Sequence, residues 1–315
     1  MRAVLHGTQG LRLGDVPAPR PRDDEALVAV AAISLNFGEI AYPPTGAPTG
    51  RVPGWDAAGI VTRGAADGSG PPAGSRVVTF GWGGAWAELR AVDTANVAVV
   101  PEDVDLGAAA ALPVAGVTAL QAVRRLGSVL GRRVLVTGAS GGTGRFAVQL
   151  AALAGAHVIA SVGDESRAEG LRELGAHEIV LGPDALSEPV FGVLDHVGGD
   201  QLADAFLRLE PDGLVQAIGR ASRLPTTIDF EAAGEASARG RLENFNVAAP
   251  FAADLTVLLR LLESGRLTSE IGWRGHWEQA ALAADALLSR RVRGKVVLDV
   301  PASRRWAAEV GNATP

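Results

Sequence analysis

The first third of the chain alternates short apolar runs with clusters of proline and glycine. Runs of alternating or β-branched residues recur up to about residue 110, among them "ALVAVAAI", "AGIVTR", "SRVVTF" and "NVAVV". Short runs of this kind, each closed by turn-forming residues, are typical of antiparallel strands. The pattern therefore predicts a barrel-like β domain over this region.

Between about residues 113 and 250, the apolar runs alternate instead with amphipathic stretches of helical length. The pattern predicts strands at 132–138, 156–163, 191–197 and 213–219, and helices at 142–154, 165–174 and 200–208. This alternation is typical of a parallel, doubly wound sheet with helices on its faces. After residue 250, two helical stretches lead to a last strand-like run at 294–300.

Composition and charge narrow the classes of function. The chain has 315 residues, enough for two domains, and a formal net charge of -6 at pH 7. Nucleic-acid binding is not expected, because phosphate backbones attract clustered lysine and arginine. The sequence has no cysteine, which excludes disulfides and cysteine-ligated zinc. We find no secretion signal and no run able to span a membrane, and therefore expect a cytoplasmic protein without membrane association.

A glycine-rich segment, "VTGASGGTGRFAVQLA", joins the strand predicted at 132–138 to the helix predicted at 142–154. Glycines there permit a tight turn and let backbone N–H groups approach a pyrophosphate, to which the helix N-terminus adds partial positive charge. A turn that binds nothing is the alternative interpretation. The position between strand and helix favours a dinucleotide site, which would include Gly138, Gly141, Gly142, Thr143 and Gly144.

The end of the second strand bears on the choice between NAD and NADP. Sheets that bind NAD usually carry a carboxylate there, which holds the ribose 2′-hydroxyl. Here the strand ends at Ser161 and Gly163 without one, and Arg167 follows as a partner for a 2′-phosphate. We therefore predict NADPH as the cofactor, with Ser161 and Arg167 in its site. Asp164 and Glu165 place negative charge nearby and favour the opposite choice.

The glycine motif alone fits two families of dinucleotide enzymes. "TGASGGTG" also matches the short-chain dehydrogenase pattern, which lies near the chain start and needs a downstream tyrosine four residues before a lysine. Here Tyr42, the only tyrosine, lies upstream of the motif, and Lys295, the only lysine, is far from it. The short-chain interpretation therefore fails.

Eight segments spread over nearly the whole chain instead resemble the medium-chain dehydrogenase/reductase superfamily, in its zinc-free quinone oxidoreductase branch. In the family's order, they are "LNFGEI", "VPGWDAAGIV", "GGAWAELRAV", "AAALPVAGVTALQAV", "VTGASGGTGRFAVQLA", "LRELGAHEIV", "LDHVGG" and "RGKVVLDV". The resemblance implies an α/β fold, with a GroES-like β-barrel catalytic domain over residues 1–112, completed by about 252–315. A Rossmann domain with a doubly wound parallel sheet would occupy residues 113–251. The resemblance also implies catalysis between the domains, and a homodimer formed through an edge of the Rossmann sheet.

The positions of the family's zinc ligands carry residues that do not suit zinc. Asn36 and Trp55 stand where zinc-dependent members have cysteine and histidine, and the third position falls within "AALP". The five histidines show no ligand spacing such as H-x-x-x-H. We therefore predict no catalytic metal.

Without a metal to polarise an alcohol or ketone, a conjugated acceptor is the easier substrate. Hydride addition to it moves negative charge onto an oxygen that a few donors stabilise. The predicted function is an NADPH-dependent, zinc-independent reductase acting on a quinone or an α,β-unsaturated carbonyl. An enoyl or polyketide-type tailoring reductase is one alternative, because "LNFGEI" and "GAWAEL" are also similar to such domains. A non-catalytic NADPH-binding adaptor of the same fold is the other.

The resemblance also implies roles for individual side chains. Asn36 and Tyr42 would be catalytic hydrogen-bond donors beside the nicotinamide, although an asparagine in a turn also suits a purely structural role. Glu39 would be either part of a proton path or a structural partner. The cofactor site would further include Thr118, Gly219, Phe245 and Asn246, and His196 would follow a strand end that faces the cofactor. The tryptophans at 55, 82 and 86 suit packing, or stacking against a flat quinone.

Overall fold

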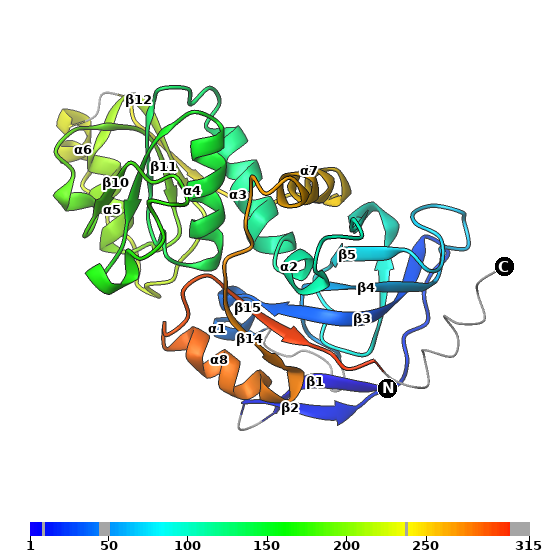
Figure 1. The fold of residues 1–315 in the computed structure, drawn as a ribbon. Coiled ribbons are helices and arrows are strands. Elements are labelled where there is room, and N and C mark those ends of the chain that lie inside the picture. The colour runs from blue at the N-terminus through cyan, green and yellow to red at the C-terminus, as the bar shows by residue number, and fades with distance from the viewer. Residues whose placement is uncertain (8–9, 44–50, 237–238, 303–315) are drawn as a thin grey trace. The chain divides into compact units, whose positions relative to one another are not determined.

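The computed structural model describes residues 1–7, 10–43, 51–236 and 239–302, and it divides into two compact units (Figure 1). The first unit, called the barrel unit below, comprises Met1–Val117 and the segment from Ala248 onwards. The second, called the sheet unit, comprises Thr118–Val247. The boundary between them falls within α3 (Pro113–Arg125). The predicted α/β class, with one barrel-like β unit and one parallel-sheet unit, is confirmed.

The barrel unit is built on a sheet in the order β14-β15-β3-β4-β5-β7, with β6 also pairing with β3, and a separate β1-β2 hairpin. Its strands are β1 (Arg2–Gly7), β2 (Gly10–Asp15), β3 (Glu25–Leu35), β4 (Asp56–Arg63), β5 (Arg76–Phe80), β6 (Leu89–Asp93), β7 (Val97–Val99), β14 (Ile271–His276) and β15 (Lys295–Asp299). The long strand β3 buries every second residue over its first half, as the alternating pattern predicts. Antiparallel β15 pairs with β3, so the C-terminal segment completes the sheet that the N-terminal residues begin.

Helices of the barrel unit are α1 (Phe37–Ala41), α2 (Leu106–Ala110), α7 (Ala252–Glu263) and α8 (Ala280–Leu288), with 3-10 turns at Thr94–Asn96 and Trp277–Gln279. Trp86 and Trp277 are fully buried and form one core with residues of β3, α8 and β15. Large aromatic side chains of this kind contribute much of the apolar area that a core buries. Trp86 is therefore a packing residue.

The sheet unit holds a six-stranded parallel sheet in the order β10-β9-β8-β11-β12-β13. Its elements are β8 (Arg133–Val136), α4 (Gly142–Leu153), β9 (His157–Ser161), β10 (Glu178–Val180), β11 (Val190–Asp195), α5 (Asp200–Leu207), β12 (Leu209–Ala217), α6 (Phe230–Ala236) and β13 (Arg241–Asn244). Helices lie against this sheet in Figure 1, as expected for strands that are buried on their faces. Leu135, Ile159, Val193, Phe206 and Val215 belong to its core.

The prediction of a helix at 165–174 is wrong. Only a 3-10 turn forms, at Glu165–Arg167, and the chain then continues in turns to residue 175. Gly170 and Gly175 have positive φ angles of 76° and 105°. Glycine adopts such angles at little steric cost and weakens helix interiors, so the apolar spacing alone does not sustain a helix here.

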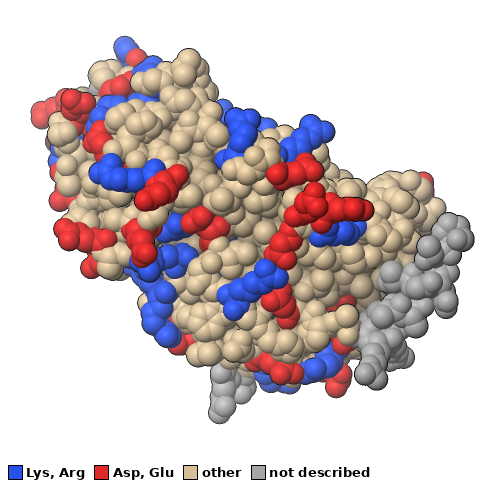
Figure 2. Space-filling view, viewed as in Figure 1, with Lys and Arg blue, Asp and Glu red and all other residues tan. Residues whose placement is uncertain are grey.

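Across the described part of the chain, no helix combines the length and the apolar character needed to cross a membrane. On the face drawn in Figure 2, basic and acidic side chains are interspersed. This distribution agrees with the modest net charge of -6.

Candidate active site

The glycine turn of the sheet unit runs from the end of β8 into α4. Gly138 has a positive φ of 59°, which favours glycine, and Gly141 is the N-cap of α4. A Cβ atom on Gly144 would lie 2.3 Å from the carbonyl oxygen of Gly138, so only glycine fits where the helix meets the turn. Gly142 and Thr143 form the first turn of α4 beside it. The five predicted phosphate-site residues thus lie on one turn that presents the N-terminus of a helix.

Arg167 contacts this turn from the end of the neighbouring strand. Its Nε donates to the Ser140 hydroxyl at 2.8 Å, and the Ala139 N–H donates to the Ser161 carbonyl at 3.1 Å. The hydroxyl oxygen of Ser161 is buried and makes no hydrogen bond to any described residue. Asp164, which opposes the NADPH prediction, is exposed, and hydrogen bonds from Ser166 lower its pKa. The 3-10 turn that follows the second strand therefore places a guanidinium beside the glycine turn.

The loops after β11 and β12 meet closely at the same edge of the sheet. Asp195 is fully buried and accepts from the Thr137 hydroxyl at 2.6 Å and from the Gly198 N–H at 2.9 Å, while burial raises its pKa. A Cβ on Gly219 would lie 2.6 Å from the His196 carbonyl oxygen, so glycine is required there as well. These contacts fix the backbone on the far side of the glycine turn from Arg167.

The other predicted cofactor residues are more scattered. Phe245 follows β13, is half-buried and donates its N–H to the Ala217 carbonyl at 3.0 Å, whereas Asn246 is exposed. Thr118 is buried on α3. Roles of these three residues in cofactor binding stay predictions.

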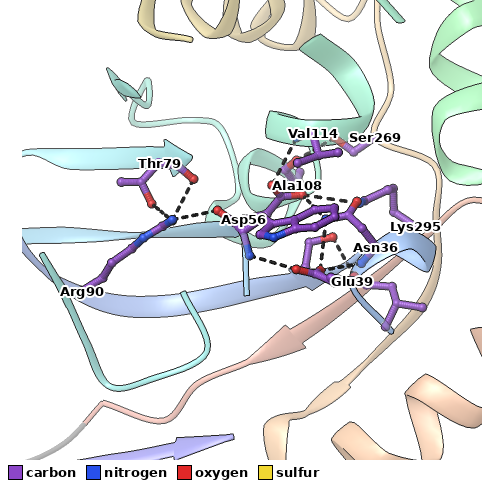
Figure 3. Close-up of polar contacts among 12 residues, drawn as sticks. Asn36, Glu39, Asp56, Thr79, Arg90, Ala108, Val114, Ser269 and Lys295 are labelled. Atoms are coloured by element: carbon purple, nitrogen blue, oxygen red, sulfur yellow. Dashed lines mark hydrogen bonds and ion pairs between the residues drawn. The ribbon is translucent and has the colours of Figure 1, made fainter. Parts of the chain in front are cut away.

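Asn36 occupies the centre of a buried polar cluster in the barrel unit (Figure 3). It caps α1, and its Oδ1 accepts from Lys295 Nζ at 2.6 Å. Its Nδ2 donates to Asp56 at 2.8 Å and to Glu39 at 3.2 Å. Because an ammonium only donates and a carboxylate accepts, these partners fix the orientation of the amide. Both amide hydrogens of Asn36 are therefore engaged within the protein.

The two carboxyl groups of the cluster are held by further donors. Glu39 accepts from the N–H groups of Asn36 at 2.8 Å and Trp55 at 3.0 Å, and Asp56 accepts from the Val114 N–H at 3.2 Å. Burial and the neighbouring Asp56 raise the pKa of Glu39 to about 8. Burial also raises the pKa of Asp56 and lowers that of Lys295, whose Nζ lies 3.7 Å from Asp56 Oδ2. With a pKa of about 8, the Glu39 carboxyl is largely protonated near pH 7, beside the buried Asp56–Lys295 pair.

Arg90 extends the cluster towards the loops of the barrel unit. Arg90 is 1% exposed, and its guanidinium donates to Thr79 Oγ1 at 2.7 Å and to the Trp55 carbonyl at 2.9 Å. It also donates to the carbonyls of Gly81 at 3.1 Å and Gly83 at 3.2 Å. One side chain therefore joins β5 to the segments around residues 55 and 81–83.

Aromatic side chains lie next to this guanidinium. Trp82 is 56% exposed and makes edge contacts with Trp55 and Phe80, at ring-centroid separations of 5.2 and 4.9 Å. Phe80 stacks on Phe251 with centroids 3.7 Å apart. Tyr42 ends α1, is half-buried and contacts Phe37 edge-on. Trp55 and Trp82, unlike Trp86, thus combine packing with accessible surface.

Known proteins are similar to this chain in sequence and in fold. Residues 22–102 match the family described as alcohol dehydrogenase GroES-like domain, and residues 174–298 match the family described as zinc-binding dehydrogenase. Over 308 residues the chain is 30% identical to quinone oxidoreductase-like protein 2 from Bos taurus. The match covers 90% of this chain and 87% of that protein. The chain belongs to the medium-chain dehydrogenase/reductase superfamily, in its quinone oxidoreductase-like branch. The predicted family is confirmed.

Two further members of the superfamily show how far the likeness extends. The chloroplast envelope quinone oxidoreductase homolog of Arabidopsis thaliana is 38% identical over 192 residues, which is 55% of this chain and 57% of the relative. The match therefore spans less than two thirds of that relative. A mycobacterial protein solved in complex with NADPH has a TM-score of 0.80 and 26% identity, covering 95% of this chain and 100% of the other.

The zinc named in one matching family does not fit the residues found here. The indole of Trp55 offers no metal ligand, and the amide of Asn36 is engaged by Lys295 and two carboxyl groups. The Lys295 ammonium also places a positive charge 3.7 Å from Asp56. Among the described residues, no group of three or more histidine, cysteine, aspartate or glutamate side chains suits a metal ion.

Several members of the site escaped the sequence analysis. Asp56 and Lys295 lay within family segments but received no role, although a single lysine in an apolar strand was a usable signal. Ser140, which holds Arg167, lay inside the glycine motif itself. Arg90 offered no signal, because nothing in "AELRAV" shows that its side chain points inward.

Proposed function

We propose that the protein is an NADPH-dependent, zinc-independent reductase of quinones or α,β-unsaturated carbonyl compounds. The observation that carries the proposal is the Arg167–Ser140 contact, which sets a guanidinium beside the glycine turn where the second strand has no carboxylate. A bidentate donor there suits a 2′-phosphate. The solved NADPH complex of a related fold supports the same choice.

The sheet unit would bind the cofactor through groups that the fold already holds in place. N–H groups of the first turn of α4 would hold the pyrophosphate, and Arg167 would pair with the 2′-phosphate. Two buried polar atoms at this edge, Ser161 Oγ and His196 Nε2, have no hydrogen-bond partner within the described ranges. This is expected where a bound ligand supplies the missing partners. When bound, NADPH supplies the hydride.

The barrel unit would hold the acceptor and stabilise the charge that develops on its oxygen. Tyr42 remains our proposed donor, and Trp55 and Trp82 offer a surface for a flat conjugated ring. Both amide hydrogens of Asn36 are engaged. Asn36 can therefore donate to the acceptor only if it first breaks its hydrogen bond to Asp56 or to Glu39. Its catalytic role therefore stays a prediction.

A non-catalytic NADPH-binding adaptor is kept as the second candidate, because the saturated amide of Asn36 leaves the barrel unit with fewer donors for turnover.

The expected homodimer and the cytoplasmic location also stay predictions. Sedimentation of the purified protein tests the dimer, for which the edge strand β13, with Leu242 38% exposed, offers a surface.

The deciding experiment is a fluorescence titration with NADPH and NADH. Arg167→Ala should weaken NADPH about 10- to 100-fold, the loss expected for a charged hydrogen-bonding partner, and leave NADH unchanged. Arg172→Ala is the matched control, because Arg172 lies in the same segment and instead bonds the His177 carbonyl. Equal losses of affinity for NADPH and NADH would show that Arg167 does not bind the 2′-phosphate.

Turnover is then measured as loss of NADPH absorbance with a benzoquinone, an enone and an enoyl thioester, each with and without a chelator. A reductase of quinones or enones oxidises NADPH at a rate that the chelator leaves unchanged. Faster turnover of the thioester favours the enoyl reductase. Tight NADPH binding with no turnover of any acceptor favours the adaptor.

A further inference from the structure

The sheet of the second unit reverses its strand order between β8 and β11. From β8 the chain adds β9 and β10 on one side, and then returns to place β11 on the other side of β8. Ligands of doubly wound sheets bind outside the carboxyl ends of the strands at such a reversal. Gly138 follows β8 there, and His196 is the first residue after β11.

His196 borders the glycine turn directly. A Cβ atom on Gly138 would lie 3.4 Å from the Cβ of His196. The backbone N–H of His196 donates to Thr137 Oγ1 at 3.0 Å, and its Nδ1 lies 2.9 Å from the Thr137 carbonyl oxygen. His196 is therefore held to the residue that precedes Gly138 by two hydrogen bonds, one from its backbone and one from its ring.

These contacts determine which ring nitrogen carries the proton. A carbonyl oxygen can only accept, so Nδ1 of His196 carries the hydrogen and donates to Thr137. Burial lowers the pKa of His196 and keeps the ring neutral near pH 7. Nε2 is then a lone-pair acceptor. It is buried, and no donor reaches it from the residues that the structure describes.

A buried acceptor without a partner is destabilising, and such atoms are uncommon in folded proteins. Here the atom lies at the edge of the sheet where a ligand is expected. We propose that Nε2 of His196 accepts a hydrogen bond from a ribose hydroxyl in the nicotinamide half of a bound dinucleotide. The inference rests on the proposed function, since it requires that the glycine turn binds a dinucleotide.

The position of β11 decides which half of the dinucleotide His196 meets. The glycine turn takes the pyrophosphate, and the end of β9, with Ser161 and Arg167, takes the adenosine ribose. β11 lies on the opposite side of β8 from β9. The half of the ligand that extends over β11 is therefore the one that carries the nicotinamide.

Calorimetric titration of the full-length protein with NADPH and with adenosine 2′,5′-bisphosphate tests this assignment, because the second ligand lacks the nicotinamide half. His196→Phe keeps a ring but has no acceptor, and it should weaken NADPH about 5- to 30-fold with less than a twofold change for the bisphosphate. His196→Gln restores an acceptor near Nε2 and should recover most of the loss. Thermal unfolding of each variant verifies that it is folded.

Equal losses for both ligands, or no loss for either, would overturn the assignment while leaving the proposed function intact. Wild-type protein that binds neither ligand would overturn both. If His196→Phe does not fold, nitrogen NMR of the wild-type imidazole decides. The Nε2 signal should move towards that of a hydrogen-bonded acceptor with NADPH and stay in place with the bisphosphate, and an unmoved signal with NADPH would contradict the proposal.

Discussion

The polar cluster around Asn36 and the carboxyl edge of the parallel sheet pair their buried polar groups differently. In the barrel unit, each side chain of a four-residue cluster makes at least one hydrogen bond of 3.2 Å or less within it. The four residues are Asn36, Glu39, Asp56 and Lys295. At the carboxyl edge of the parallel sheet, Ser161 and His196 keep buried polar atoms that have no partner in the described structure. The first arrangement stabilises a fold, whereas the second is typical of a site whose remaining partner is a ligand.

The largest expected effect comes from removing the cation of the closed cluster. Lys295→Met leaves Asp56 and Glu39 buried without their ammonium, and we expect a loss of about 3–5 kcal/mol in the free energy of unfolding. Urea denaturation measures it. Arg274→Met is the matched control, because Arg274 pairs with Asp105 and Asp299 at an exposed site and should cost about 1 kcal/mol or less. Equal losses in the free energy of unfolding for the two variants would show that burial does not make Lys295 more important to stability than Arg274.

An intermediate effect is expected at the glycine turn. Gly144→Ala places a Cβ 2.3 Å from the Gly138 carbonyl and should cost about 1–3 kcal/mol of stability, together with a loss of dinucleotide affinity. Gly163→Ala is the control, because a Cβ there meets no described atom within 4 Å. Thermal unfolding and NADPH titration of both variants test the difference. If Gly144→Ala binds NADPH as wild type does, the turn is not the phosphate site.

The smallest effect compares one buried serine from each unit. Ser34 donates to the Val296 carbonyl at 2.8 Å, so Ser34→Ala should cost about 1 kcal/mol. Ser161→Ala removes a buried hydroxyl that makes no bond to any described residue, and the free energy of unfolding should change by less than about 0.5 kcal/mol. NADPH affinity should instead fall a few-fold in Ser161→Ala alone. A large stability loss in Ser161→Ala would show that the Ser161 hydroxyl stabilises the fold as the Ser34 hydroxyl does.

Local sequence signals predicted the parts of the fold that depend on local physics. The glycine turn was found because strand, turn and helix follow one another without interruption, and steric limits around Gly144 act within a few residues. The same local reasoning failed at 165–174, where Gly170 and Gly175 overrode an apolar spacing that resembles a helix. The family, and with it the two-unit α/β fold, followed from eight segments taken together.

The polar cluster was beyond this kind of reasoning. Asn36 and Lys295 are 259 residues apart in sequence, and no pattern within either segment shows that their side chains meet. Asn36 was predicted as a donor for the substrate, but its hydrogens are engaged by Asp56 and Glu39, which only the folded sheet brings to it. Similarly, the order of β8 and β11, rather than any motif, brings His196 to the glycine turn.

The place of Lys295 in the chain has a consequence for synthesis. Ribosomes extend chains at about 5–20 residues per second, and Lys295 follows Asn36 by 259 positions, so tens of seconds separate their synthesis. The residues of the sheet unit are contiguous and emerge complete within that interval. The barrel unit, although its first strands are made first, receives the ammonium that pairs with its buried Asp56 only after the whole sheet unit has been made. A truncated or stalled chain that ends before β15 would thus carry a finished nucleotide-binding half beside an electrostatically incomplete barrel.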